Sequence, residues 1–343
     1  MAERALVTGG GGFLGRHIVL QLLARGDRVR VLGRHRYPAL EARGVECVTA
    51  AIDDAEAVRA ACRGVDVVFH AAAIAGVWGD PALFQRTNVV GTEAVIAACR
   101  AERVGRLVHT SSPSVVSSLD AVDHDGPDES LPIPTRFAGE YPRTKAAAEA
   151  LVLAAHGPDL HTVALRPHLI IGPGDPHLVP RVIQGALAGR LAVVGEGTNR
   201  VDLTWVENAA RAHLQAASAM AGGRAGGRAY FISNGEPVEL WTWVKAFLAA
   251  LELPPLTRQV PLKKALRAAG ALETTWRLLG LAGEPPLTRF AAVQMATSHW
   301  FDISAARRDL GYDPERVPMA EATARLVAWW REGLGRYELL RMR

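Results

Sequence analysis

The sequence predicts an α/β fold with a doubly wound parallel sheet and a smaller, mixed lobe in its C-terminal part. Two observations carry this prediction. Through residues 4–167, short runs rich in apolar and β-branched residues alternate with amphipathic segments of roughly ten residues, the pattern of βαβ units. Beyond residue 167 the chain becomes richer in proline and tryptophan, and the alternation is lost.

Length and composition set the outer limits. The 343 residues suffice for two lobes, and 49% hydrophobic with 22% charged residues is typical of a soluble globular protein. Apolar runs fall short of the roughly 20 residues that a membrane span needs, and no signal-peptide pattern is present, so we expect a cytoplasmic protein without a span. Cys47, Cys62 and Cys99 lack the spacing of a disulfide framework or a metal site, so no metal is expected. A net charge of +4 with scattered basic residues does not favour nucleic-acid binding.

The elements follow in order. Strand 4–8 leads through a glycine-rich turn into helix 16–26, which Gly26 closes, and strand 28–33 completes the first unit. The same alternation continues through strand 45–52, helix 54–62, strand 65–73, helix 88–102, strand 106–112, helix 145–155 and strand 161–167. Because helices separate consecutive strands, the strands are expected to run parallel, with helices on both faces of the sheet.

The first turn has the composition of a phosphate-binding loop. Gly9, Gly12 and Gly15 form a G-x-x-G-x-x-G pattern between the first strand and its helix. Glycines let backbone N–H groups approach a pyrophosphate, and the positive end of the helix stabilises its charge. This context predicts a Rossmann-type dinucleotide site rather than a merely structural turn.

The end of the second strand indicates which dinucleotide is bound. An NAD site usually has an acidic residue there for the ribose 2′-hydroxyl. This chain has Gly33 followed by Arg34, His35 and Arg36, and guanidinium groups can pair with a 2′-phosphate. We therefore expect NADP(H), with NAD(H) as the alternative.

The stretch YPRTK places Tyr141 and Lys145 four residues apart, on one face of a helix that would begin at Pro142. Upstream, the strand 106–112 ends in Thr110, Ser111 and Ser112, at the sheet edge where ligands bind in doubly wound folds. Taken alone, such a Tyr–Lys pair is more often a solvated surface pair than a catalytic one.

Together these motifs resemble the extended short-chain dehydrogenase/reductase superfamily. The stretches that carry the resemblance are the glycine turn, HAAA (70–73), TNVVGT with Asn88, TSS (110–112), YPRTK and LRP (165–167). The resemblance implies that Tyr141 is the general acid/base, that Lys145 binds the nicotinamide ribose and lowers the tyrosine pKa, and that Ser112 polarises the substrate carbonyl. A free tyrosine has a pKa near 10 and needs a nearby cation to exchange protons at neutral pH.

The resemblance also implies a set of cofactor-binding residues and a homodimer formed by the helix after TNVVGT and the helix beginning at YPRTK. The expected cofactor-binding residues are Gly9, Gly12, Phe13, Leu14, Gly15, Arg34, Arg36, Ile52, Asp53, Ala71, Ala72, Ala73, Asn88, Thr110, Tyr141, Lys145 and Pro167. One departure affects the adenine contact. Where the family often has an aspartate, this chain has Ala51, so Asp53, Asp54 or the backbone near Ile52 would have to serve.

We expect two lobes that are discontinuous in sequence. Residues 1–167 would form the dinucleotide-binding domain, and 204–235 would return to it as helix 207–221 and strand 228–233. Residues 168–203 and 236–343 would form the substrate-binding lobe.

Within the superfamily the chain resembles the 3β-hydroxysteroid dehydrogenase-related group, and most closely the bacterial 2-alkyl-3-oxoalkanoate reductases of long-chain olefin biosynthesis. The stretches are RYPAL (36–40), TSSPSVV (110–116), ALRPHLIIGPGD (164–175), YFISNGEP (230–237), EPPLTRF (284–290) and HWFDISAARRDLGY (299–312). The resemblance implies reduction of a 3-keto acid with two alkyl arms by NADPH, and association with other enzymes of the olefin pathway. Ser112, His168, Arg181 and Arg289 are candidate substrate contacts; each arginine is more often structural.

Three other functions compete. A nucleotide-sugar epimerase or dehydratase would usually have an acidic residue after the second strand, where this chain has Gly33 and Arg34. A non-catalytic NADP-binding regulator typically lacks the Tyr–Lys pair, which is intact here. A 3β-hydroxysteroid or sterol dehydrogenase bound to membranes is the third, and segment 263–283 would be its membrane contact, although Arg267, Glu273 and Arg277 exclude a dry span.

Overall fold

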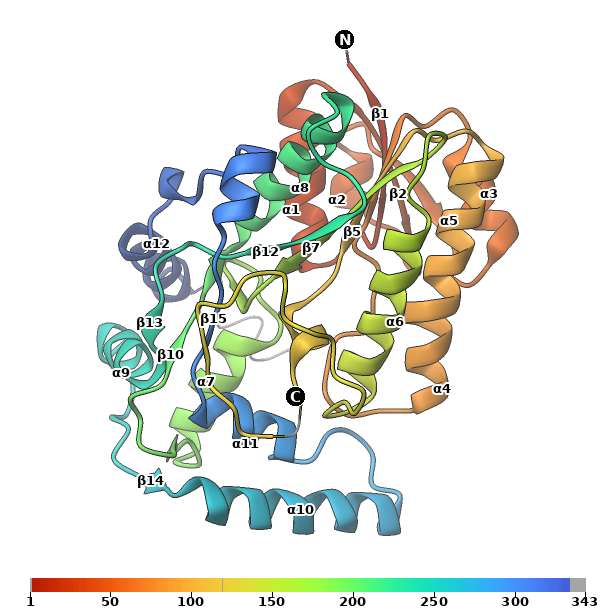
Figure 1. Ribbon diagram of the computed structural model, residues 1–343. Helices are drawn as coiled ribbons and strands as arrows, with labels where there is room; N and C mark the ends of the chain where they lie inside the picture. The colour runs from red at the N-terminus through yellow and green to blue at the C-terminus, as the bar shows by residue number, and fades with distance from the viewer. Residues whose placement is uncertain (1, 119, 334–343) are drawn as a thin grey trace.

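The computed structural model describes residues 2–118 and 120–333 and is built on a seven-stranded parallel sheet (Figure 1). The strands lie in the order β12-β7-β5-β4-β1-β2-β3, and all neighbouring pairs are parallel. Their bounds are Arg4–Thr8 (β1), Arg28–Gly33 (β2), Glu46–Thr49 (β3), Val67–His70 (β4), Arg106–Thr110 (β5), His161–Pro167 (β7) and Arg228–Ile232 (β12). The predicted doubly wound α/β fold is confirmed.

Helices cover both faces of the sheet and bury a separate core on each. One face carries α1 (Phe13–Arg25) and α8 (Val206–Ala221); the other carries α3 (Ala55–Cys62), α5 (Gly91–Ala101) and α6 (Glu140–Ala154). The short helices α2 (Pro38–Glu41) and α4 (Pro81–Phe84) lie in connections, and the π-helical turn η1 (Gln85–Val90) leads directly into α5. Ile18 is fully buried in the first core and Val95 in the second.

Strands β3 and β4 each end three residues earlier than the sequence predicted, and strand pairing explains why. β3 is an edge strand whose register with β2 ends at Thr49, opposite Gly33. β4 ends at His70, opposite the last residue of β1. The residues expected to extend them, 50–52 and 71–73, form loops at the carboxyl edge of the sheet.

A second core lies outside the main sheet. The helices around it are α7 (Leu178–Leu187), α9 (Leu240–Ala250), α10 (Leu262–Leu279), α11 (Arg289–Ala296) and α12 (Met319–Arg331). Trp205, Phe247 and Trp330 are among its buried side chains. For residues 236 onward the sequence predicted only a smaller, mixed lobe and did not locate the helices α9 to α12. Prolines between the helices break the periodic pattern into short pieces, which hides the helical content.

The remaining strands form small sheets beside this core. A mixed four-stranded sheet has the order β13-β10-β15-β6, and two further parallel pairs are β11-β8 and β14-β9. The bounds are His124–Asp125 (β6), Ile170–Ile171 (β8), Val193–Val194 (β9), Arg200–Val201 (β10), Thr204–Trp205 (β11), Val238–Glu239 (β13), Gln259–Val260 (β14) and His299–Trp300 (β15). Short turns complete the fold: η2 (Pro113–Val116) and η4 (Pro314–Arg316) are 3-10 helical, and η3 (Ala306–Leu310) is π-helical.

The chain passes between the main sheet and the second core more than once. After β7 it enters the second core, then returns as α8 and β12, and β12 pairs along its whole length with β7. It then leaves again for α9 to α12. The division into domains at residues 167, 203 and 235 stays a prediction.

Candidate active site

The Tyr–Lys pair lies on α6, beside the carboxyl end of β5. The helix begins at Glu140, two residues before the predicted start, so Pro142 still lies in the first turn. Proline is tolerated there because the N–H groups of a first helical turn have no partner within the helix. Tyr141 is therefore carried by a well-defined helix start, with Lys145 one turn further on.

Lys145 is buried and directed at the end of β5. Its Nζ donates to the Thr110 carbonyl at 2.6 Å and lies 3.3 Å from His109 Nε2. A lysine ammonium has three protons, so one N–H remains for a ligand. Burial lowers the pKa of Lys145 to about 8, and the Glu149 carboxylate opposes that shift.

Tyr141 and Ser112 face each other across the site. Burial raises the pKa of Tyr141, and its hydrogen bond with Ser112 opposes this only in part. Ser112 caps η2, with Oγ accepting from the Ser114 N–H at 3.2 Å. The resemblance implied that Lys145 lowers the tyrosine pKa, but burial outweighs any such effect here because the Lys145 ammonium is turned toward Thr110.

A buried ionic network lies behind these residues, and the sequence reasoning missed it. Arg166 on β7 donates to both oxygens of the Glu149 carboxylate, at 2.5 and 2.9 Å, and Ser111 Oγ donates to the same carboxylate at 2.6 Å. The Arg166 guanidinium also lies 5.1 Å from the centre of the Phe231 ring. Two signals could have indicated the network: Glu149 follows Lys145 by four residues, and Arg166 follows the apolar run 163–165 of its strand.

The histidines near the site are neutral, and their partners fix their tautomers. Thr92 Oγ1 donates to the Asn88 carbonyl, so it accepts from His70 Nε2, and His70 Nδ1 accepts from Thr8. Burial lowers the pKa of His70 to about 3 and that of His213 to about 4. His213 Nδ1 donates to the Ala209 carbonyl, and Nε2 therefore accepts from the Thr110 hydroxyl. None of these rings can act as an acid at neutral pH.

The glycine turn has the geometry that a bound pyrophosphate requires. Gly9 has φ of +69°, and a Cβ on Gly15 would lie 2.2 Å from the Gly9 carbonyl oxygen. Gly12 is exposed, and as N-cap of α1 it provides no capping side chain. The N–H groups of Phe13, Leu14 and Gly15 in the first turn are thus available to an anion. These residues fit a dinucleotide.

The two arginines after β2 differ in their surroundings. Arg34 is exposed and, within the part of the chain that the structure describes, has no ion-pair or hydrogen-bond partner. Arg36 pairs with Glu41, at 2.8 and 3.3 Å. The ring of Tyr37 lies over the turn, where a Cβ on Gly11 or Gly33 would collide with it. Arg34 is therefore the arginine that is free to meet a 2′-phosphate.

Other expected cofactor residues already have protein partners. Asn88 Oδ1 accepts from the Ile74 N–H at 2.8 Å and fixes the loop that contains Ala71, Ala72 and Ala73. Asp53 pairs with Arg86 at 3.1 Å. Ile52 is buried against Gly91 of α5. Asp53 is therefore engaged elsewhere, and its contact with adenine stays a prediction.

The three substrate candidates beyond Ser112 are engaged outside the Tyr–Lys site. His168, directly after β7 and its last residue Pro167, lies 2.7 Å from His299 of β15 through their ring nitrogens. Arg181 of α7 pairs with Glu284 at 2.6 Å, and Arg289 of α11 pairs with Glu273 of α10 at 2.8 Å. These two ion pairs hold α10 and the segment after it in place. Substrate binding by the three stays a prediction.

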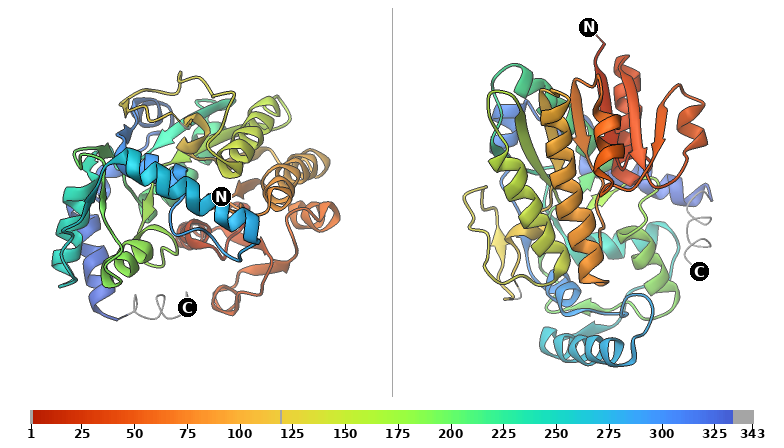
Figure 2. Two further views of the ribbon diagram at one scale, coloured as in Figure 1. Left: turned by 90° about the horizontal axis from the view of Figure 1, so that it is seen from below. Right: turned by 90° about the vertical axis from the view of Figure 1, so that its right-hand side faces the viewer.

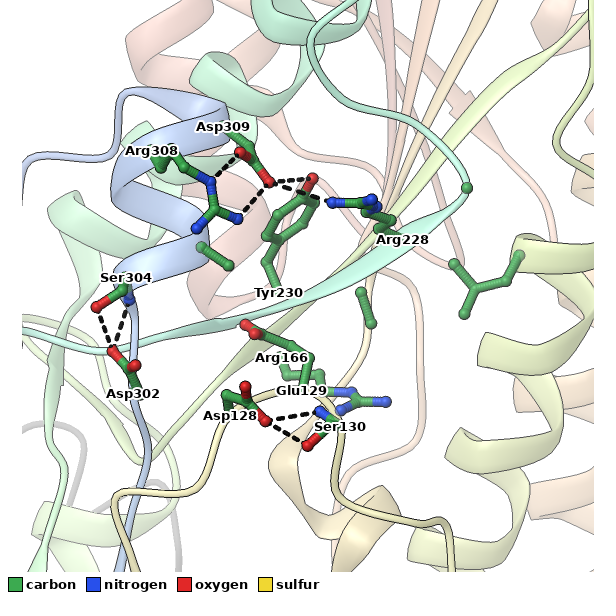
Figure 3. A pocket seen from close by; sticks show the side chains of 14 residues that line it. Asp128, Glu129, Ser130, Arg166, Arg228, Tyr230, Asp302, Ser304, Arg308 and Asp309 are labelled. Carbon is green, nitrogen blue, oxygen red and sulfur yellow. Dashed lines mark hydrogen bonds and ion pairs between the residues drawn. The ribbon is translucent and has the colours of Figure 1, made fainter.

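A cavity of about 430 Å³ lies beside β12 (Figure 3). Tyr141, Lys145 and Ser112 are not among the residues that line it. Arg166 and Tyr230 line it, and Asp309 closes one side by pairing with Arg228 and Arg308. Residues 2–118 and 120–333 contain no group of His, Cys, Asp and Glu side chains placed to hold a metal ion.

Comparison with known proteins gives consistent results. The model of the 3-beta hydroxysteroid dehydrogenase/isomerase family matches residues 6–262. A 2-alkyl-3-oxoalkanoate reductase from Stenotrophomonas maltophilia is 48% identical over 95% of this chain and 98% of its own length. A mouse sterol-4-alpha-carboxylate 3-dehydrogenase, decarboxylating, is 35% identical over 95% of this chain and 90% of its own length. Among solved structures, a double mutant of DesIV, a dTDP-glucose 4,6-dehydratase from Streptomyces venezuelae with NAD and DAU bound, has a TM-score of 0.74 and 27% identity, covering 97% of this chain and 98% of its own.

Proposed function

This chain belongs to the 3-beta hydroxysteroid dehydrogenase/isomerase family and is an NAD(P)-dependent oxidoreductase, and from that premise we propose that it reduces a 2-alkyl-3-oxoalkanoic acid to the 3-hydroxy acid with NADPH, in long-chain olefin biosynthesis. The observation that carries the substrate class is the 48% identity to a 2-alkyl-3-oxoalkanoate reductase, which extends over 95% of this chain. The similarity therefore includes the second core as well as the cofactor site.

The site residues support reduction. In this proposal the nicotinamide supplies a hydride to the carbonyl carbon. The Tyr141 hydroxyl gives its proton to the carbonyl oxygen, to which Ser112 also donates a hydrogen bond. Because burial raises the pKa of Tyr141, the phenol is protonated at neutral pH and ready to act as an acid. Lys145, held by Thr110, has one N–H left for the ribose and keeps a positive charge one turn away on α6.

The cofactor preference is supported by Arg34. It is exposed at the end of β2, where an NAD site usually has a carboxylate, and its guanidinium has no protein partner among the described residues. NADPH is therefore the proposed donor, and NADH the weaker alternative.

A second candidate is oxidation at a sterol 3-position, and the mouse relative favours it. The two relatives' names share one feature: a carboxylate attached to the carbon next to the reacting carbon. An epimerase or dehydratase activity has less support because no acidic residue follows β2. A regulator without activity has little support because Tyr141, Lys145 and Ser112 are all placed at one site.

The proposal includes a homodimer formed by α5 and α6. Both helices expose small side chains, among them Ala97 on α5 and Ala150 on α6, which would allow close helix packing. Association with other enzymes of the olefin pathway is a further part of the proposal.

The test is NADPH oxidation with purified protein. The panel contains 2-alkyl-3-keto acids with arms of increasing length, their methyl esters, a sterol carboxylate and a nucleotide sugar. Each methylene enclosed by the protein contributes about 0.8 kcal/mol, so kcat/KM should rise severalfold per methylene until the pocket is filled. We expect acids to react faster than esters. A series without length dependence or acid preference would exclude this substrate class and leave a carbonyl reductase with another partner.

A further inference from the structure

Helix α10 is exposed along one entire side. Figures 1 and 2 show it as the outermost element at one end of the molecule, on the side toward which the carboxyl ends of the parallel strands point. Its inner side buries Ala265, Ala269 and Glu273. Its exposed residues follow the helical period and are Lys263, Lys264, Arg267, Ala268, Ala271, Thr274, Thr275, Arg277, Leu278 and Leu279.

The exposed side is positively charged. Lys263, Lys264 and Arg267 lie in its first two turns, and none has an ion-pair partner in the part of the chain that the structure describes. Arg277 follows three turns further on. The helix has one carboxylate, Glu273, which is buried and accepts from both the side chain and the N–H of Arg289. The cations therefore face solvent without acidic neighbours on the same helix.

The end of the helix is apolar as well as exposed. Leu278 is 81% exposed, Leu279 67% and Leu281 41%. Among the described residues, seven large apolar side chains are this exposed, and three of them fall within these four positions. Clustered exposed leucines are costly in water and mark a surface that is covered in use.

This apolar end lies next to the functional edge of the sheet. The Arg277 guanidinium is 5.2 Å from the centre of the Trp78 ring, and Trp78 belongs to the loop that follows β4. That loop begins with Ala71, Ala72 and Ala73, which are among the expected cofactor-binding residues. The leucines and the catalytic edge thus belong to one end of the molecule.

We propose that the exposed side of α10, with Leu278, Leu279 and Leu281 at its end, docks on the surface of an anionic lipid bilayer. Anionic headgroups would meet the four cations, and the leucines would enter the boundary of the acyl chains, as amphipathic helices do when they lie in an interface. No described helix is long and apolar enough to cross a membrane, so the contact is peripheral. The purpose of the contact rests on the proposed function, because a substrate with two long alkyl arms partitions into the same lipid.

A lipid surface fits this side of the helix better than a protein does. The cations at the start of α10, Arg277 near its end and the exposed leucines after it lie on the solvent side of one helix. A layer of anionic headgroups above acyl chains complements both the charged and the apolar part of such a surface. The surface is a single straight helix at one end of the molecule, which can lie flat on a plane (Figure 2).

The test is co-flotation of the full chain with vesicles of phosphatidylcholine, alone or mixed with phosphatidylglycerol. We expect binding to the mixed vesicles, weakened by salt, and little binding to phosphatidylcholine alone. The triple variant Lys263→Glu, Lys264→Glu, Arg267→Glu should lower partitioning by about 10²-fold or more, since each basic residue near an anionic surface contributes about 1 kcal/mol. Leu278→Glu with Leu279→Glu should abolish it.

Matched controls are the exposed Leu187→Glu on α7, and the triple reversal of Arg43, Arg63 and Lys245, which are exposed on other elements. These should bind as the wild type does. Equal binding of wild type and α10 variants, or equal binding to both vesicle types, would overturn the proposal. A lipid-independent increase in mass that the leucine variants abolish would instead identify a protein-binding face. Turnover of a short-arm substrate without vesicles should be the same in all variants, so a failure of the proposed chemistry is seen separately from a failure to bind lipid.

Discussion

The carboxylate of Glu149 and the guanidinium of Arg166 form an ion pair that is closed to solvent, with their side chains 0% and 4% exposed. The pair joins α6, which carries Tyr141 and Lys145, to β7, which lies between the edge strand β12 and β5 in the main sheet. Ser111 donates to the same carboxylate and lies next to Ser112 in the chain. The Glu149 carboxylate thus fixes the positions of Tyr141, Lys145 and Ser112 relative to one another.

Glu149→Gln should lower both stability and activity. It leaves Arg166 buried without a counter-charge, which costs about 3–5 kcal/mol in comparable pairs. It also removes the negative charge that raises the pKa of Lys145, so the alkaline limb of the kcat profile should move to lower pH. The measurement is the pH–rate profile beside a denaturation curve. Ser111→Ala, which removes a hydrogen bond but no charge, should leave that limb in place; an unmoved limb in Glu149→Gln would make the residue purely structural.

Tyr141→Phe should lower kcat by at least about 10²-fold, the usual contribution of a general acid. NADPH binding, followed by fluorescence titration, should change little because the phenol proton is needed only in the chemical step. Tyr230→Phe is the control, since its hydroxyl meets Asp309 in the cavity beside β12. Near-normal turnover in Tyr141→Phe would remove this residue from the role.

Lys145→Met should abolish most activity and yet stabilise the protein at pH 7. Burial lowers the pKa of Lys145 from 10.5 to about 8, so the unfolded chain binds an extra proton between these values. Stability of the wild type should therefore rise with pH from about 8 to 10.5, and the variant should lack that rise. At pH 7 we expect the free energy of unfolding of the variant to be higher than that of the wild type by about 1–2 kcal/mol, after subtracting the contribution of the lost hydrogen bond to Thr110. Urea unfolding of the wild type and the variant at pH 7 and pH 10 measures both effects. A variant that is less stable than the wild type at pH 7 would contradict the lowered pKa of Lys145.

Arg34→Ala should weaken the binding of NADPH about ten- to hundredfold, because one charge-assisted hydrogen bond contributes about 1.5–3 kcal/mol. The binding of NADH should be nearly unchanged. Arg36→Ala should have a smaller effect, since Glu41 already holds that guanidinium. Equilibrium binding of both cofactors to both variants distinguishes the two arginines. A loss that is equal for NADPH and NADH would mean that neither reads the 2′-phosphate.

The mass in solution should be twice 36.7 kDa if α5 and α6 form the proposed dimer. Ala97→Glu with Ala150→Glu places charges on the small-residue faces and should give a monomer. Light scattering at micromolar concentration measures the mass of the wild type and of this double variant. The control is Ala246→Glu, an exposed position on α9; a wild-type mass of one chain would rule the dimer out.

The main sheet was predictable because the sequence alternates apolar strands with helices up to Pro167, and the glycine turn and YPRTK lie at the boundaries of these elements. Pro142 is a case in point: the rule that proline suits a first helical turn located the helix start to within two residues. Such features are local, so a reading of neighbouring residues captures them.

Features that depend on distant partners were not predictable. A charged residue after an apolar run marks Arg166 as unusual, but it does not identify Glu149, seventeen positions away on another element, as its partner. Arg181 and Arg289 were candidates for a substrate carboxylate although an arginine is more often structural, and the sequence could not identify their acidic partners. These partners, Glu284 and Glu273, are supplied by the segment around α10. The opposite shift of the Tyr141 pKa likewise depends on burial, which a sequence does not report.

The place of β12 has a consequence for synthesis. This strand, residues 228–232, forms one edge of the main sheet, and α8 covers the face on which α1 packs. A ribosome that has released only the residues through β7 has therefore produced a sheet with one strand missing and one face partly bare. The buried Ala209, Ala212 and Ala216 of α8 are what that face lacks. The nascent chain must then keep this apolar surface from aggregating until about two thirds of the protein has been made, so translation pauses or chaperones acting in that interval would affect yield more than those acting earlier.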